Sequence, residues 1–312
     1  MERSVNFYLN RVKPIPSTLR SDPRLDSSPA ASISVNLGAL FLHHYFDSYG
    51  IAPPNPDPSR FEYLDLISSS SDFRFHSFVA SASSVKKRHL STEFGQSFCR
   101  LMLQEHFGIR YFAHMADVLD KPTHAAFDGL RIARISSGDT PDYLCARKST
   151  EPRIAEAKGR FSTIGFSSTT FQKWRDQFDR ICLYDRRGKG LSMKGFIIAT
   201  RLAAEGMRNG TCVYLEDPDT HGEPVPTSES LVSVGRVAIA MHYASVFRKL
   251  GLAPLANALH NGFDLTPQLS INIPVWTCMV PPFQGAEFVG GGSISRRKGL
   301  FRVSQRKDGS CP

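Results

Sequence analysis

Two acidic residues and a lysine in this chain have the types and spacing of a metal-assisted phosphate site. Asp142 directly follows Pro141, and Glu156 and Lys158 stand two positions apart in the segment Glu-Ala-Lys. Side chains two apart on a strand share a face. Two carboxylates can hold Mg²⁺, for which Mn²⁺ can substitute, while substrate phosphate and water fill the remaining positions. A nearby ammonium can orient the attacking water or help deprotonate it, and offsets charge that builds on the phosphate.

Two short strands are expected to position these residues. Residues 142–146 and 153–158 have strand character, and the polar connection between them suits a hairpin. The hairpin would bring Asp142 beside Glu156, with the two carboxylates within about 6 Å of each other, close enough to share one cation.

Further elements are expected on both sides of this hairpin. A helix over 92–107 begins at Ser91 or Thr92 as cap and ends at Gly108. Thr169 or Thr170 can cap a second helix, whose apolar face predicts burial of its aromatic side chains. That face carries Phe171, Trp174, Phe178 and Ile181. Strands are expected over 195–201 and 211–215, and helices from 228 and over 253–260.

The sequence therefore predicts an α/β fold with a mixed sheet flanked by helices. The Pro- and Ser-rich residues 1–85 are interpreted as an irregular N-terminal arm with one or two small elements. Residues 86–270 are interpreted as the core domain, and 271–312 as a C-terminal extension of strands and loops.

The order of elements and the residues Pro141-Asp142 and Glu156-Ala157-Lys158 resemble the PD-(D/E)XK, or restriction-endonuclease-like, nuclease superfamily. The resemblance covers about residues 90–215. It implies a core of helix, strand, strand, helix, strand and Mg²⁺-dependent hydrolysis of DNA by Asp142, Glu156 and Lys158. It also implies that Glu93, on the first helix, joins Asp142 and Glu156 at the metal. A Gln that recurs after the Glu-X-Lys strand in several branches is matched by Gln177 or Gln172.

Less specific interpretations of the same residues stay open. Glu156 and Lys158 can be a solvated pair on an exposed strand with Asp142 in a turn, Glu93 can be a first-turn acid that favours the helix dipole, and Gln177 can face solvent. The chain can also be an inactive member of the fold that binds nucleic acid or assembles with other subunits, or an unrelated adaptor.

Composition fits a nucleic-acid partner without requiring one. The 312 residues are 41% hydrophobic and carry a net charge of +9, which favours polyanions. Basic segments at 85–89, 185–189 and 295–298 could follow a phosphate backbone. We expect DNA as partner, with RNA left open, a homodimer or a multi-subunit system as further possibilities, and by analogy a role in bacterial defence.

The remaining sequence signals concern redox state and location. The six cysteines are scattered singly, and no apolar stretch approaches the ~20 residues that span a bilayer. The histidines lack the paired spacing of zinc proteases. These features predict a reduced, cytoplasmic protein without membrane contact.

Overall fold

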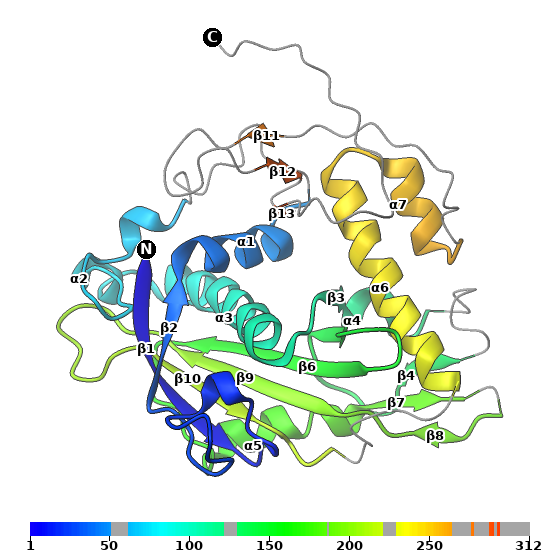
Figure 1. Ribbon diagram of the computed structural model, residues 1–312, viewed down its shortest axis with the longest axis horizontal. Coiled ribbons are helices and arrows are strands. Elements are labelled where there is room, and N and C mark those ends of the chain that lie inside the picture. The colour runs from blue at the N-terminus through cyan, green and yellow to red at the C-terminus, as the bar shows by residue number, and fades with distance from the viewer. Residues whose placement is uncertain are drawn as a thin grey trace, which may run out of the picture.

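A mixed sheet of seven strands with helices against both faces forms the centre of the molecule (Figure 1). The computed structural model describes residues 1–50, 62–121, 130–185, 187–220 and 229–263, and the backbone of three short strands at 276–277, 287–289 and 292–293. The expected class, an α/β fold whose mixed sheet is flanked by helices, is confirmed.

The strand order places the predicted hairpin toward one side of the sheet. In spatial order the strands are β2 (Ser32–Asn36), β1 (Glu2–Asn10), β10 (Cys212–Glu216), β9 (Gly195–Arg201), β6 (Pro152–Arg160), β5 (Tyr143–Ala146) and β3 (Tyr111–His114). β1 and β10 run parallel, as do β6 and β9. The other neighbours are antiparallel.

One face of the sheet is covered by α1 (Leu37–Ser48) and α3 (Ser84–Phe107). Aromatic rings of α3 join Ala155 and Ala157 of β6 in one core cluster. The helix approaches β6 so closely that a Cβ atom on Gly159 would lie 1.6 Å from the carbonyl oxygen of Ser91. Glycine at this position therefore permits the crossing of α3 and β6.

The opposite face is covered by α5 (Thr169–Arg175) and α6 (Glu229–Lys249), and α7 (Ala253–His260) packs against α6. Short helical segments are α2 (Ser77–Ala80), α4 (Met115–Val118) and the 3₁₀ turns η1 (Ser17–Leu19), η3 (Leu64–Leu66) and η5 (Phe178–Arg180). None of the described helices has the length and apolar character that a membrane span requires.

Two smaller sheets complete the described strands. One consists of β4 (Arg131–Arg134), β7 (Ile181–Tyr184) and β8 (Gly190–Leu191), and the other of β11 (Trp276–Thr277), β12 (Glu287–Val289) and β13 (Gly292–Ser293). Apart from these last three strands, residues 271–312 lie outside the described part of the chain.

The structure contains strands that the expected core order of helix, strand, strand, helix, strand does not include. β3 follows α3 almost directly and pairs with β5, so a further strand precedes the hairpin. The first helix also begins before residue 92, because Ser83 caps it by accepting from the N–H of Lys86 at 3.2 Å. The hydroxyls of Ser91 and Thr92 instead donate to the carbonyl of Arg88 within the helix.

The interpretation of residues 1–85 as an irregular arm is wrong for residues 2–10 and 32–48. These form β1, β2 and α1, and β1 pairs with β10 inside the main sheet. Val5 and Phe7 alternate with exposed residues, which is the period-two pattern of a half-buried strand. The breaker-rich segment begins only after this strand ends.

The expected aromatic helix after the hairpin is shorter than predicted. Trp174 and Phe178 are buried, as expected. The helix ends at Arg175, Phe178 lies in η5, and Ile181 begins strand β7. All three side chains belong to the core cluster on the α5 and α6 face of the sheet, so burial is preserved although the helical periodicity is not.

Candidate active site

The β5–β6 hairpin brings Asp142 and Glu156 together. The strands are antiparallel with Tyr143 opposite Ala155, so Asp142, one residue before β5, lies beside the middle of β6. The backbone N–H of Asp142 donates to Glu156 Oε2 at 3.1 Å, and Asp142 Oδ2 accepts from the N–H of Ala157 at 2.8 Å. Asp142 is close enough to Glu156 to contribute to the raised pKa of Glu156.

Lys158 completes the cluster. Its Nζ forms an ion pair with Glu156 Oε1, and 26% of its side chain is exposed, whereas that of Glu156 is fully buried. Alternation along β6 sends Glu156 and Lys158 to the face that also carries Ile154, away from α3. The lysine thus connects a buried carboxylate to the surface of the molecule.

The carboxylate cluster concentrates charged side chains where they have little access to solvent. Burial, followed by the neighbouring Asp142, raises the pKa of Glu156 well above its usual range, and Lys158 offsets only part of this effect. Burial by itself would lower the pKa of Lys158, but the carboxylates of Glu156 and Asp142 together raise it. Lys158 is therefore an ammonium at neutral pH.

The donor set fits Mg²⁺. Two carboxylates that repel each other in a buried site are stabilised by a divalent cation. Mg²⁺ is commonly held by one or two carboxylates and completes its octahedron with water and substrate phosphate. Within the described ranges, no group of three or more His, Cys, Asp and Glu side chains is arranged to hold a metal ion. Asp142 and Glu156 would thus be the side-chain ligands.

Glu93 does not join this pair. Its Oε2 accepts from the hydroxyl of Tyr63 at 2.5 Å, and its Oε1 lies 3.2 Å from Nε2 of His89. α3 packs on the face of the sheet opposite to the one toward which Glu156 and Lys158 point. The structure therefore does not bring Glu93 to the carboxylate pair. It is not a first-turn acid either, because α3 begins at Ser84.

The two glutamines have different environments. Gln177, just after α5, is buried, and its Oε1 has no hydrogen-bond partner among the described residues, so the solvent-facing interpretation is wrong. Gln172 is exposed and binds its helical neighbours Asp176 and Arg175. No described hydrogen bond joins either amide to Asp142, Glu156 or Lys158.

Asp139 is an acidic neighbour that the sequence reasoning missed. Its carboxylate is close enough to Lys158 to contribute to the raised pKa of the lysine, after Glu156 and Asp142. Asp139 is exposed and lies three residues before Asp142. The signal was available, since two acids flank Thr140-Pro141 at the entrance to β5.

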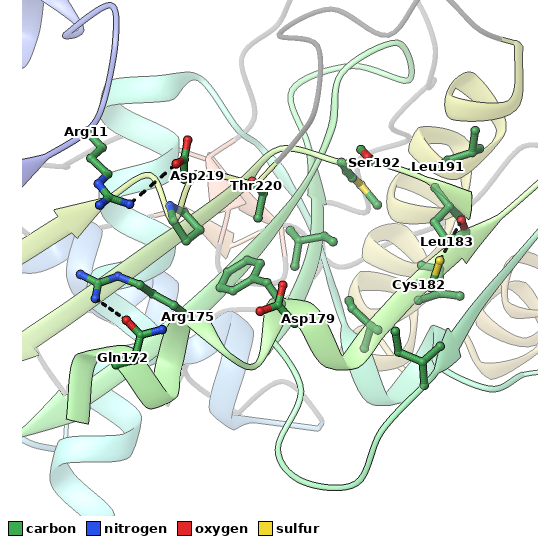
Figure 2. A pocket seen from close by; sticks show the side chains of 17 residues that line it. Arg11, Gln172, Arg175, Asp179, Cys182, Leu183, Leu191, Ser192, Asp219 and Thr220 are labelled. Atoms are coloured by element: carbon green, nitrogen blue, oxygen red, sulfur yellow. Dashed lines mark hydrogen bonds and ion pairs between the residues drawn. The ribbon is translucent and has the colours of Figure 1, made fainter. Parts of the chain in front are cut away.

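A cleft of about 600 Å³ lies near the N-terminal end of β6. Ile154, two residues before Glu156 and on the same face, is part of its wall. Figure 2 shows Arg11 paired with Asp219 at 3.9 Å on one side of this cleft and Arg175 joined to Gln172 nearby. Asp142, Glu156 and Lys158 are not among its lining residues, so the cleft is separate from the carboxylate cluster.

The basic segments have mixed surroundings. Residues 85–89 lie in the first turns of α3, where Lys86 stands 5.5 Å over the ring of Tyr63. In the turn between β7 and β8, Asp185 accepts from the N–H groups of Arg187 and Lys189. Residues 295–298 lie outside the described part of the chain. No described interaction ties these segments to the carboxylate cluster.

Comparison with protein-family models, curated proteins and solved structures finds no match to this chain.

Proposed function

We propose that this chain is a Mg²⁺-dependent nuclease of the PD-(D/E)XK type that hydrolyses phosphodiester bonds in DNA. The observation that carries the proposal is the buried carboxylate of Glu156, held beside Asp142 and paired with Lys158 on one face of the β5–β6 hairpin. Lys158 brings one positive charge to two carboxylates in a buried place, and a divalent cation would compensate the remaining negative charge.

The order of elements supports the same proposal. α3 precedes the hairpin, α5 follows it, and β9 then pairs parallel to β6. These elements follow the order of the core that the motif implies, although β3 and β4 lie between α3 and the hairpin, and β7 and β8 lie between α5 and β9. The restriction-endonuclease-like core is part of the proposal.

Each residue then has a definite role. Asp142 and Glu156 would hold Mg²⁺, or Mn²⁺ in its place, and the ion would polarise the phosphate and lower the pKa of a bound water. Lys158, as an ammonium, stabilises the negative charge that develops on the phosphate and orients the attacking water. In the net reaction, the hydroxyl of water adds to phosphorus and its proton passes to the departing oxygen.

The test is incubation of the protein with plasmid, linear and single-stranded DNA, with and without Mg²⁺ or Mn²⁺. We expect metal-dependent cleavage by the wild type, none by Lys158→Ala, and wild-type cleavage by Lys173→Ala, since Lys173 is an exposed lysine on α5. A wild type that leaves all three substrates intact, or cleavage that survives Lys158→Ala, would contradict the proposal.

A second candidate is an inactive nuclease fold that binds nucleic acid or serves as an assembly subunit. One observation favours it: Glu93 is held by Tyr63 and His89 on the opposite side of the sheet, which leaves two acidic ligands where the motif implied three. This candidate predicts DNA binding without cleavage under every metal tested. A role in defence against foreign DNA would be compatible with either candidate.

A further inference from the structure

The cleft near the N-terminal end of β6 lies between the main sheet and the small sheet of β4, β7 and β8. Each strand of the small sheet supplies an apolar side chain to its wall: Ile132, Leu183 and Leu191. Ile154 of β6 and Phe178 of η5 add to this apolar part. A volume of about 600 Å³ with apolar walls is typical of sites for small molecules, whose clefts commonly measure ~300–1,000 Å³.

The opposite end of the cleft is polar. Figure 2 shows Arg11, Asp219 and Arg175 on one side of it, and Leu183 and Leu191 on the other. Arg11 directly follows β1, and Asp219 lies three residues after the end of β10. Because β1 and β10 are parallel neighbours, both residues lie at the same edge of the main sheet. In α/β sheets, ligands commonly bind beyond the carboxyl ends of parallel strands.

Arg11 and Asp219 share a backbone conformation that residues other than glycine rarely adopt. The angle φ is 58° at Arg11 and 64° at Asp219, and Asp120 is the one other non-glycine residue with a positive φ in the described ranges. Such conformations cost free energy and recur at ligand-binding sites, where the surrounding structure holds the residue in place. Two of these three residues therefore lie together at the polar end of one cleft.

Arg11 is better placed than Arg175 to bind a ligand. The Arg11 guanidinium lies 3.9 Å from the Asp219 carboxylate, and both side chains are more than half exposed, so this ion pair contributes little to stability. Arg175 binds both oxygens of the buried Glu216 and also donates to Gln172. Its guanidinium is thus already engaged, whereas a ligand carboxylate can replace Asp219 at Arg11 through a charge-assisted hydrogen bond.

We propose that this cleft binds a small organic acid, with its carboxylate at Arg11 and an aromatic or branched aliphatic body against Ile132, Leu183 and Leu191. The site is independent of the proposed nuclease function, since no residue of the carboxylate cluster lines the cleft. A second hollow of about 590 Å³, formed within residues 9–15 and 26–29, also has Arg11 in its wall. A test of the site must therefore distinguish the cleft from this hollow.

The experiment uses anilinonaphthalenesulfonate, a fluorescent apolar anion, as the probe on the full chain at fixed salt. Its displacement by naphthoate is compared with its displacement by naphthamide, which has the same rings but no charge. The wild type should bind the probe, and naphthoate should displace it at a concentration about tenfold lower than naphthamide, because hydrogen bonds between charged groups are the stronger ones.

Variants assign the effect to the cleft. Arg11→Gln should remove the preference for naphthoate and leave displacement by naphthamide unchanged, and Arg24→Gln, at another exposed arginine, is the matched control. Ser192 is exposed and lines the cleft but not the second hollow, so Ser192→Trp should block binding of the probe. Ser192→Gln serves if the tryptophan variant fails to fold. Asp179→Asn removes a carboxylate from the wall and should leave the affinity for naphthoate equal or higher.

Several results would overturn the organic-acid site. A wild type that does not bind the probe, or binding that persists in both Ser192 variants, shows that the cleft is not the site. Equal displacement by naphthoate and naphthamide, or a preference for naphthoate that survives Arg11→Gln, shows that Arg11 does not receive a carboxylate. If Asp179→Asn weakens binding and naphthylmethylamine displaces the probe better than naphthoate does, the cleft takes cations instead of acids.

Discussion

The backbone N–H of Asp142 donates a hydrogen bond of 3.1 Å to the side chain of Glu156, and so joins the beginning of β5 to the middle of β6. The return bond, from the N–H of Ala157 to Asp142 Oδ2, means that each acid has one carboxylate oxygen fixed by the opposing backbone. These bonds orient both carboxylates before any ligand binds. A preorganised pair of this kind loses little free energy to side-chain ordering when a cation arrives.

Replacement of Glu156 with glutamine should separate activity from stability. Glu156→Gln removes a metal ligand and should lower cleavage by at least about a hundredfold, while it also removes a buried charge beside Asp142. Without metal, we therefore expect a melting temperature equal to or above that of the wild type. Thermal unfolding in EDTA and a cleavage assay measure the two effects. A variant that loses both activity and several degrees of stability would indicate a structural role for Glu156.

Lys158→Ala should abolish turnover without abolishing metal binding. The substitution removes a cation next to Asp142 and Glu156 and leaves both carboxylates, so repulsion of Mg²⁺ decreases. Calorimetric titration should give Mg²⁺ affinity equal to or above that of the wild type, whereas Glu156→Ala should bind Mg²⁺ weakly.

DNA binding in EDTA should respond in the opposite sense to these two variants. Loss of the Glu156 carboxylate relieves repulsion of phosphate, so affinity should hold or rise, and loss of the Lys158 ammonium should lower it slightly. If Lys158→Ala loses its metal affinity, the lysine acts by organising the carboxylates and not by acting on the phosphate.

Glu93→Gln should affect stability more than activity. Its carboxylate is bound by the hydroxyl of Tyr63 and lies near His89, on the side of the sheet away from Glu156. Weakening a charge-assisted hydrogen bond costs about 1–2 kcal/mol, while Mg²⁺ affinity and cleavage should stay within about threefold of the wild type. Chemical denaturation and a metal titration check this. A tenfold or greater loss of Mg²⁺ affinity would restore Glu93 as a ligand.

The contrast between Glu93 and the hairpin residues shows how far the sequence can predict a site. Asp142, Glu156 and Lys158 lie within one hairpin, so local strand pairing determines their proximity and a period of two determines their common face. Glu93 could be assigned to a helix from the sequence. The face of the sheet that this helix covers depends on close backbone contacts at Gly95 and Gly159. The spacing of apolar residues in the sequence does not indicate those contacts.

The interpretation of the N-terminal residues as an irregular arm fails for a different reason. β1 pairs in parallel with β10, more than 200 residues away in sequence, and nothing local to residues 2–10 identifies that partner. The alternation of Val5 and Phe7 with polar residues is a local strand signal that the interpretation of residues 1–85 as an irregular arm overlooked.

Gly159→Ala should destabilise the protein by several kcal/mol. A Cβ atom there would lie 1.6 Å from the carbonyl oxygen of Ser91, so α3 and β6 would have to separate. Gly165→Ala is the matched control, since no non-neighbouring atom of the described residues lies within 4 Å of its Cβ position, and it should be neutral or stabilising by up to about 1 kcal/mol. Urea denaturation compares the two. Equal stabilities would mean that the close crossing of α3 and β6 is not maintained in solution.

Lys249 should make stability depend on pH in the alkaline range. Burial, followed by repulsion from Arg100, lowers the pKa of its ammonium to about 8, whereas a lysine in the unfolded chain has a pKa near 10.4. Below pH 8 both states hold the proton, and the cost of burying the charge is fully present. Between about pH 8 and 10.4 the folded state releases the proton first, so stability rises with pH.

The measurement is the free energy of unfolding of the wild type minus that of Lys249→Met, followed from pH 7 to 10. The difference should rise by an amount on the order of 3 kcal/mol, because each pKa unit corresponds to about 1.4 kcal/mol. Lys249 also donates a hydrogen bond to the carbonyl of Tyr49 at the end of α1, and Lys249→Met lacks this bond. The difference in unfolding free energy therefore also contains the contribution of the bond, which is largest at pH values where Lys249 is protonated. The same difference taken with Lys173→Met, at an exposed lysine, should stay flat. A flat profile for Lys249→Met as well would show that the Lys249 ammonium is solvated in the folded protein.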